Sequence, residues 1–162
     1  MNTTSNERGD TRRALIVKAT RLALGAGFCS ILGESAGATP DMMREAIGKL
    51  VGSSPVNEGR VTLDIPPLVE NGNTVPLTVA VESPMTEADH VTAIHIFNEK
   101  NPQPYVIAAH FGPRAGKAAF ATRAKLSDSQ RIIAIARMSD GSFWMAGADV
   151  IVTIAACVEM NE

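Results

Sequence analysis

The chain has 162 residues, of which 45% are hydrophobic and 20% are charged. This composition is typical of one folded domain and excludes a disordered or low-complexity chain. The formal net charge of -2 gives no basic field that would attract nucleic acid. Aromatic residues make up only 4%, so we expect a core of aliphatic side chains. The two cysteines, Cys29 and Cys157, are too few for a disulfide framework.

Residues 1–38 have the order of segments that is typical of an export signal. A polar start is followed by Arg12-Arg13, by two apolar runs and by the small residues Ala36-Gly37-Ala38, which suit cleavage after Ala38. The paired arginines and the modest hydrophobicity predict export to the periplasm by the twin-arginine route. An uncleaved anchor is an alternative, although neither run reaches the roughly 20 apolar residues of a membrane-spanning helix. A lipoprotein signal acylated on Cys29 is another.

The remaining domain, residues 39–162, begins with a helix pattern and continues with strand patterns. Thr39-Pro40 suits the start of a helix, apolar residues follow at helical spacing, and Gly52 is expected to end the helix. Beyond that point the hydrophobic period changes to two, which indicates strands. Seven or eight short strands are predicted, at residues 61–65, 77–81, 91–97, 105–111, 118–126, 130–138, 143–146 and 148–154.

Turn signals separate these strands at regular intervals. Asp140-Gly141 is the strongest hairpin signal, and Asn71-Gly72 also indicates a turn. No helix pattern lies between the strands, so a parallel sheet is not expected. We therefore predict an all-β fold, an immunoglobulin-like antiparallel β-sandwich with a short N-terminal helix. In the strand at residues 91–97, one face is expected to carry Val91, Ala93, His95 and Phe97.

Three histidines, His90, His95 and His110, are candidates for a metal site or for acid–base chemistry. His95 and His110 belong to neighbouring predicted strands and are expected to lie close together. A copper site in an exported sandwich is one interpretation. However, no H-x-H motif or Cys/His cluster fixes a metal geometry, so structural histidines are the stronger interpretation and we predict neither a metal nor a cofactor. The chain also lacks the G-x-S-x-G motif of a serine hydrolase.

Cys157 is the single cysteine that follows the predicted export signal. A cysteine thiolate attacks disulfides and polysulfur species and can hold sulfur as a covalent adduct. The alternation of Val150, Val152 and Ile154 supports a second interpretation, in which the last strand continues and Cys157 is a small packed residue. Both interpretations stay open on the residues alone.

Several segments of the chain resemble one known family. The matching segments are Ser83-Pro84-Met85-Thr86, Ile94-His95-Ile96-Phe97, Lys100-Asn101-Pro102, His110-Phe111, Ala121-Thr122-Arg123, Ile133-Ala134-Ile135-Ala136, residues 138–146, and Val152-Thr153-Ile154 ahead of the cysteine. On these segments the chain resembles the SoxY family, the sulfur-carrier subunits of the periplasmic thiosulfate-oxidising Sox system. The resemblance covers essentially all of residues 39–162.

The resemblance implies an immunoglobulin-like sandwich, a heterodimer with a SoxZ subunit and a cysteine on a flexible C-terminal arm. Cys157 matches that cysteine and would carry thiosulfate-derived sulfur covalently. The resemblance also implies transient partners: a haem enzyme, SoxAX, that couples thiosulfate oxidatively to the cysteine, and a hydrolase, SoxB, that acts on the adduct. The chain itself would be a substrate carrier and not an enzyme.

The tail departs from the Gly-Gly-Cys-Gly-Gly ending of the family. Here the cysteine lies in Ala155-Ala156-Cys157-Val158, and Ala and the β-branched Val have less backbone freedom than Gly. Glu159 and Glu162 add negative charge near the sulfur, which is expected to disfavour the thiolate and to repel anionic thiosulfate. The alternative function is therefore a SoxY-like paralogue that acts as a binding or scaffold subunit without carrier activity.

Overall fold

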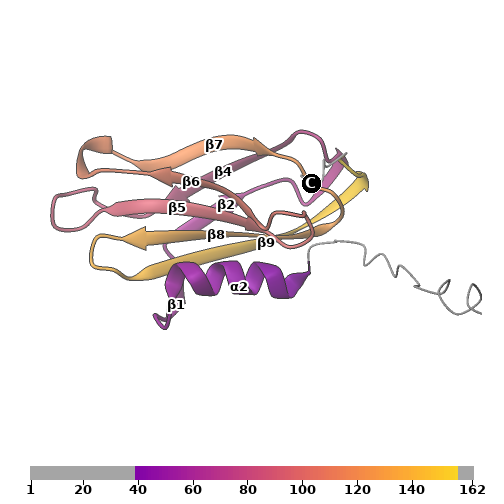
Figure 1. The fold of residues 1–162 in the computed structure, drawn as a ribbon. Coiled ribbons are helices and arrows are strands. Elements are labelled where there is room, and N and C mark those ends of the chain that lie inside the picture. The colour runs from indigo at the N-terminus through magenta and orange to yellow at the C-terminus, as the bar shows by residue number, and fades with distance from the viewer. Residues whose placement is uncertain (1–38, 157–162) are drawn as a thin grey trace, which may run out of the picture. The chain divides into compact units, whose positions relative to one another are not determined.

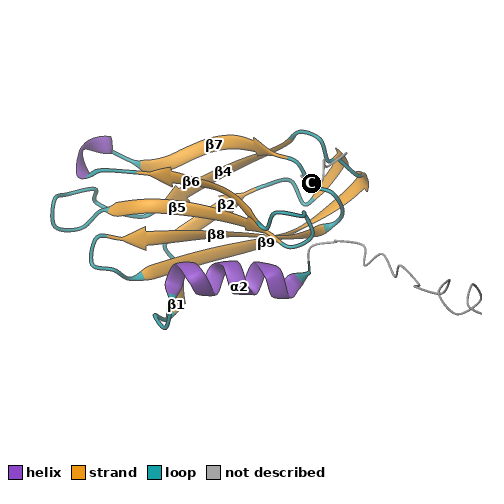
Figure 2. Ribbon diagram, viewed as in Figure 1, coloured by secondary structure: helices purple, strands orange, loops and turns teal. Residues whose placement is uncertain are grey.

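A computed structural model describes residues 39–156 of the chain, and the predictions for the export signal and for Cys157 fall outside these residues. The described part is mostly strand, with one α-helix (Figure 2). The elements are α2 (Pro40–Val51), β1 (Val56–Glu58), β2 (Val61–Asp64), β3 (Leu68–Asn71), β4 (Val75–Val81), β5 (Val91–Asn98), β6 (Tyr105–His110), the 3-10 turn η1 (Pro113–Ala115), β7 (Ala118–Ala124), β8 (Gln130–Met138) and β9 (Phe143–Ile154).

The strands form two sheets that pack face to face (Figure 1). The larger sheet has the order β1-β9-β8-β5-β6, with β3 also paired to β9, and the smaller sheet has the order β2-β4-β7. Neighbours within β9-β8-β5-β6 and within β2-β4-β7 run antiparallel. The prediction of an immunoglobulin-like β-sandwich with a short N-terminal helix is confirmed.

The core between the sheets consists of aliphatic side chains, as the low aromatic content indicates. Burial of this apolar surface stabilises the sandwich by roughly 25 cal/mol per Å² removed from water. The large side chains buried most completely in this core are Val75, Val79, Leu77, Val91, Ile94, Ile96, Leu126, Ile132, Met138 and Val150.

Helix α2 covers part of the outer face of the larger sheet (Figure 1). Thr39 is its N-cap residue, and Gly52 ends it with a φ of 60°. Its apolar side contacts a second cluster of buried residues on the sheet. These residues are Met43 of the helix itself and Phe97, Ile133, Ile135 and Phe143 of the strands. Within the described residues, no helix has the length and apolar character needed to cross a membrane.

Strand β5 is buried on both faces: the smaller sheet covers one face, and α2 packs against Phe97 on the other. A β-bulge between Val91 and Ala93 shifts the alternation by one residue. Val91 therefore packs in the core between the sheets together with Ile94, whereas the sequence pattern placed it on the face of Phe97. The prediction for Val91 was wrong because the alternation of apolar residues in the sequence does not reveal a β-bulge.

Strand β9 is one continuous strand of 12 residues, where the sequence pattern predicted two strands separated at Gly147. Gly147 pairs with Ile133 of β8 and does not interrupt the strand. A Cβ atom at this position would lie 3.0 Å from Nη2 of Arg131. The glycine therefore makes room for the guanidinium group that lies over it.

Two short strands that the sequence did not predict extend the larger sheet. β1 and β3 both pair with β9 in parallel, with Val56 opposite Phe143 and Leu68 opposite Ile151. They have three and four residues, which is too short for a clear alternation of polar and apolar residues. The larger sheet is therefore mixed at this edge, although its other pairs are antiparallel.

Candidate functional site

The last strand leads to the candidate carrier residue. β9 ends at Ile154, and Ala156 follows it as a buried residue that is only 7% exposed. The backbone N–H of Ala156 donates a hydrogen bond of 3.0 Å to the carbonyl oxygen of Leu126. Cys157 is the next residue in the sequence and lies outside the described residues. The candidate cysteine therefore follows a residue that is fixed to the sandwich.

Gly72 also forms backbone hydrogen bonds with the segment that precedes Cys157. Its N–H donates to the carbonyl oxygen of Ile154, and its own carbonyl oxygen accepts from the N–H of Leu126, both at 2.8 Å. Three backbone hydrogen bonds thus join Gly72, Leu126, Ile154 and Ala156. We call these four residues the C-terminal anchor.

Glycine is required in the anchor because the backbones approach very closely. A Cβ atom on residue 72 would collide with the carbonyl oxygen of Leu126 and would lie 2.9 Å from the amide nitrogen of Ala156. The sequence indicated only a turn at Asn71-Gly72. The contact with Leu126 and Ala156 depends on the tertiary fold, so sequence reasoning missed this role.

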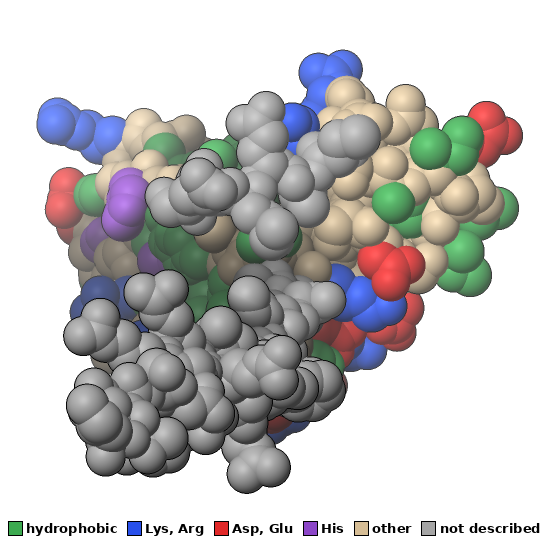
Figure 3. Space-filling model, turned by 45° about the vertical axis from the view of Figure 1, so that its right-hand side comes forward, with side chains coloured by type: hydrophobic (Ala, Val, Ile, Leu, Met, Phe, Trp, Pro, Cys, Tyr) green, Lys and Arg blue, Asp and Glu red, His purple; other side chains and the backbone are tan. Residues whose placement is uncertain are grey.

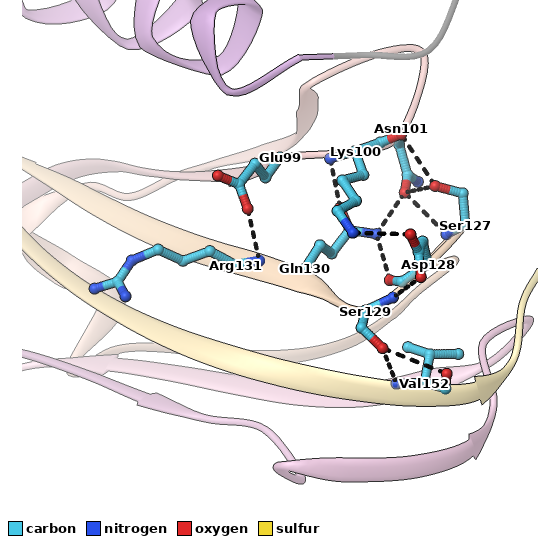
Figure 4. A network of polar contacts seen from close by, with 9 residues as sticks. All are labelled: Glu99, Lys100, Asn101, Ser127, Asp128, Ser129, Gln130, Arg131 and Val152. Atoms are coloured by element: carbon cyan, nitrogen blue, oxygen red, sulfur yellow. Dashed lines mark hydrogen bonds and ion pairs between the residues drawn. The ribbon is translucent and has the colours of Figure 1, made fainter.

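A polar network lies next to the anchor and joins the loop after β5 to the turn between β7 and β8 (Figure 4). Oδ1 of Asn101 accepts hydrogen bonds from the Ser127 N–H at 3.1 Å and from Nε2 of Gln130 at 2.9 Å. Nδ2 of Asn101 donates to the carbonyl oxygen of Lys125 at 2.8 Å. Oε1 of the buried Gln130 accepts from the Lys100 N–H at 2.9 Å. The loop is therefore bonded to the turn by both of these amide side chains.

Ser129 extends this network to β9 (Figure 4). Its Oγ accepts from the N–H of Val152 at 2.9 Å and donates to the Val152 carbonyl oxygen at 3.4 Å. Val152 lies two residues before the end of β9. The network and the C-terminal anchor together brace the segment that leads to Cys157. Lys100-Asn101-Pro102 was noticed in the sequence as part of the family resemblance, whereas no pattern singled out Ser129.

The structure brings His95 and His110 together, as expected from their neighbouring strands. Their ring centroids are 6.4 Å apart, and Nδ1 of His95 lies 2.8 Å from the hydroxyl of Tyr105. His90 is held separately, with Nδ1 3.0 Å from the carbonyl oxygen of Thr86. Within residues 39–156, no group of three or more His, Cys, Asp or Glu side chains is arranged to hold a metal ion.

The environment of His95 predicts a pH dependence of stability. Burial, and after it the charges of His110 and Arg137, lower the pKa of His95 below its ordinary value of 6.5. Near pH 6 the unfolded chain therefore binds more protons than the folded chain, so the free energy of unfolding rises with pH. This contribution is present above the ordinary pKa and is lost as the pH falls through the lowered pKa of the folded state.

We expect urea denaturation to give a free energy of unfolding that decreases from pH 7 to pH 5. The variant His95→Gln, which cannot titrate, should show a flatter dependence. The carboxyl groups of Asp128 and Asp140 also have lowered pKa values, but they titrate below this range. An unchanged slope in His95→Gln would contradict the assignment to His95.

The chain is similar to a known protein family and to a sulfur carrier protein of known structure. A family model described as sulfur oxidation protein SoxY matches residues 47–157. The solved structure of the sulfur carrier protein SoxY from Chlorobium limicola f thiosulfatophilum is 29% identical and has a TM-score of 0.59. The match covers 70% of this chain and 98% of that chain. None of the curated proteins compared with the chain matches it.

A second solved structure resembles the chain in fold alone. The superoxide reductase from Nanoarchaeum equitans is 15% identical, with a TM-score of 0.50, and the match covers 59% of this chain and 100% of that chain. Such an identity indicates a shared sandwich and carries no functional argument. The family model, in contrast, matches well over half of the sequence and ends at Cys157, and this chain belongs to the SoxY family of sulfur oxidation proteins.

Proposed function

We propose that this chain is a sulfur carrier that binds thiosulfate-derived sulfur covalently on Cys157. The family match reaches this residue, which is the single cysteine after residue 38. The Chlorobium neighbour is itself described as a sulfur carrier protein.

Loading of the carrier joins Sγ of Cys157 to the outer sulfur atom of thiosulfate. The S–H bond breaks, an S–S bond forms, and one proton and two electrons leave. The electrons pass to a haem enzyme of the SoxAX type, which acts as the oxidant. Hydrolysis by an enzyme of the SoxB type then adds water, releases sulfate and two protons, and leaves a persulfide anion on Cys157. The partner enzymes supply the catalytic groups for both steps.

The place of action that fits this chemistry is the periplasm. Residues 1–38 have the order of a twin-arginine signal, and export would bring the carrier to the Sox enzymes. A SoxZ-like subunit would complete a heterodimer with the sandwich. The proposed export rests on the signal pattern of residues 1–38, and the proposed heterodimer rests on membership of the SoxY family.

A scaffold subunit without carrier activity is the second candidate, and the burial of Ala156 favours it. A swinging arm needs free residues between the fold and its thiol. Here the residue immediately before Cys157 is buried and bonded to Leu126. The described part of the chain therefore leaves no free residue between the fold and Cys157.

Intact-mass measurement after incubation with thiosulfate and a SoxAX-type enzyme separates the two candidates. A carrier gains the mass of a thiosulfate adduct, and Cys157→Ser, which removes the single cysteine after residue 38, loses that adduct completely. A wild-type chain that stays unmodified while it still binds a SoxZ-like subunit would overturn the carrier proposal in favour of the scaffold.

A further inference from the structure

The outer face of the larger sheet carries a second group of polar and basic side chains, which is separate from the C-terminal anchor. Ala93 of β5 pairs with Arg137 of β8 on one side and with His110 of β6 on the other. Side chains of paired residues in antiparallel strands project from the same face, so Arg137 and His110 flank the small Ala93. His95 lies two residues further along β5 on that face. We call His95, Tyr105, His110 and Arg137 the basic cluster.

The hydrogen-bonding groups of this cluster are held in fixed positions. His95 is only 8% exposed, and Nδ1 lies 2.8 Å from the Tyr105 hydroxyl. The rings of His95 and His110 meet edge to face, with an interplanar angle of 82°. When the Tyr105 hydroxyl donates to Nδ1, the proton of the neutral imidazole is on Nε2, which then acts as a donor. In that tautomer His95 presents one N–H donor, and the hydrogen bond to Tyr105 holds the ring in place.

The charges around His95 are positive. Burial first, and then the electrostatic effects of His110 and Arg137, lower the pKa of His95. Arg137 forms none of the ion pairs found among residues 39–156, whereas Arg131 on the same face of β8 pairs with Asp149 at 3.1 Å. A metal cation would be repelled by Arg137, but an anion would be attracted. Figure 3 shows histidine side chains gathered on one face, with hydrophobic, basic and acidic side chains near them.

We propose that the basic cluster binds a small tetrahedral oxyanion, the chemical class of sulfate, thiosulfate and phosphate. The planar guanidinium of Arg137 presents two parallel N–H donors to oxygen atoms of such an anion. His110 contributes a donor from the opposite side of Ala93. This site is separate from covalent loading of Cys157 and does not depend on it.

Titration of the full chain with sodium sulfate, sodium thiosulfate and sodium phosphate tests the site. The ring resonances of His95 and His110 are followed by NMR while sodium chloride keeps the ionic strength constant. We expect saturable shifts with a Kd of about 1 mM or tighter for at least one of the three anions, and the tightest of them identifies the source. Arg137→Gln should weaken this binding at least tenfold.

Arg131→Gln is the matched control, because it removes the same charge from the same face of β8. Arg131 lies six residues from Arg137, about 20 Å along the strand, and it should leave the affinity unchanged. Shifts that never saturate, or an unchanged affinity in Arg137→Gln, would overturn the proposal. An equal loss in both variants would also overturn it, because it would indicate a diffuse charge effect instead of a site.

Discussion

We expect Gly72→Ala to lower the free energy of unfolding by about 3 kcal/mol. The added Cβ would collide with the carbonyl oxygen of Leu126 and press on the backbone of Ala156, and neither is a flexible side chain that can turn away. Overpacking of this kind costs about 1–3 kcal/mol. Each of the three anchor hydrogen bonds that is strained or lost adds about 1 kcal/mol. Urea denaturation of the two proteins measures the difference.

Gly48→Ala is the matched control for this substitution. Gly48 lies inside α2 and has no atom within 4 Å of its would-be Cβ. Alanine is the better helix former, so this variant should gain about 0.5–1 kcal/mol. A loss of stability in Gly72→Ala together with a gain in Gly48→Ala would separate close approach from a general effect of adding a methyl group.

The anchor also predicts how the thiol of Cys157 responds. When Ala156 is released from Leu126, the segment before the cysteine gains freedom. The reaction of Cys157 with a disulfide reagent under native conditions should then be faster in Gly72→Ala than in the wild type and unchanged in Gly48→Ala. Unchanged stability together with an unchanged thiol rate would show that the backbone relaxes around the new methyl group, and it would contradict the rigid anchor.

The fold was largely predictable because its strands alternate and helix α2 has a clear start and end. The period of two in β4, where Val75, Leu77 and Val79 are buried, is sufficient to recognise a sandwich strand. Alternation fails where a strand is covered on both sides or carries a bulge, as at Val91 in β5. It also fails for β1 and β3, which are too short to show a period and exist because β9 offers them an edge.

The candidate site was predictable only in part. Cys157 was recognised because it is the single cysteine after residue 38 and because it matches the cysteine of the SoxY family. His95 and His110 were recognised because they belong to neighbouring predicted strands. Gly72, Ser129 and Arg137 did not stand out, because each acts on residues that are distant in sequence. Gly72 meets Leu126, Ser129 bonds Val152, and Arg137 reaches the histidines through strand pairing. Such contacts are set by the register of the sheets and not by local sequence patterns.

Asn101→Ala is expected to lower the free energy of unfolding by about 2–3 kcal/mol. The side chain of Asn101 satisfies the Ser127 N–H, Nε2 of Gln130 and the carbonyl oxygen of Lys125. Removing it leaves partly buried polar groups without a partner, and each such group costs about 1–3 kcal/mol unless water replaces the bond. Asn73→Ala is the matched control, because Asn73 is exposed and its side chain bonds to Asn71 at 3.1 Å. We expect that change to stay within about 0.5 kcal/mol.

The functional consequence of Asn101→Ala is expected at the end of β9. The network positions Ser129, whose Oγ accepts from the N–H of Val152, and β9 in turn leads to Ala156 and Cys157. Amide hydrogen exchange at Val152 and Ala156 should therefore become faster in Asn101→Ala and stay slow in Asn73→Ala. A loss of stability with unchanged exchange at both amides would mean that the network stabilises the loop after β5 but does not brace the strand end. Faster exchange at both would show that this polar network stabilises the strand end that leads to Cys157.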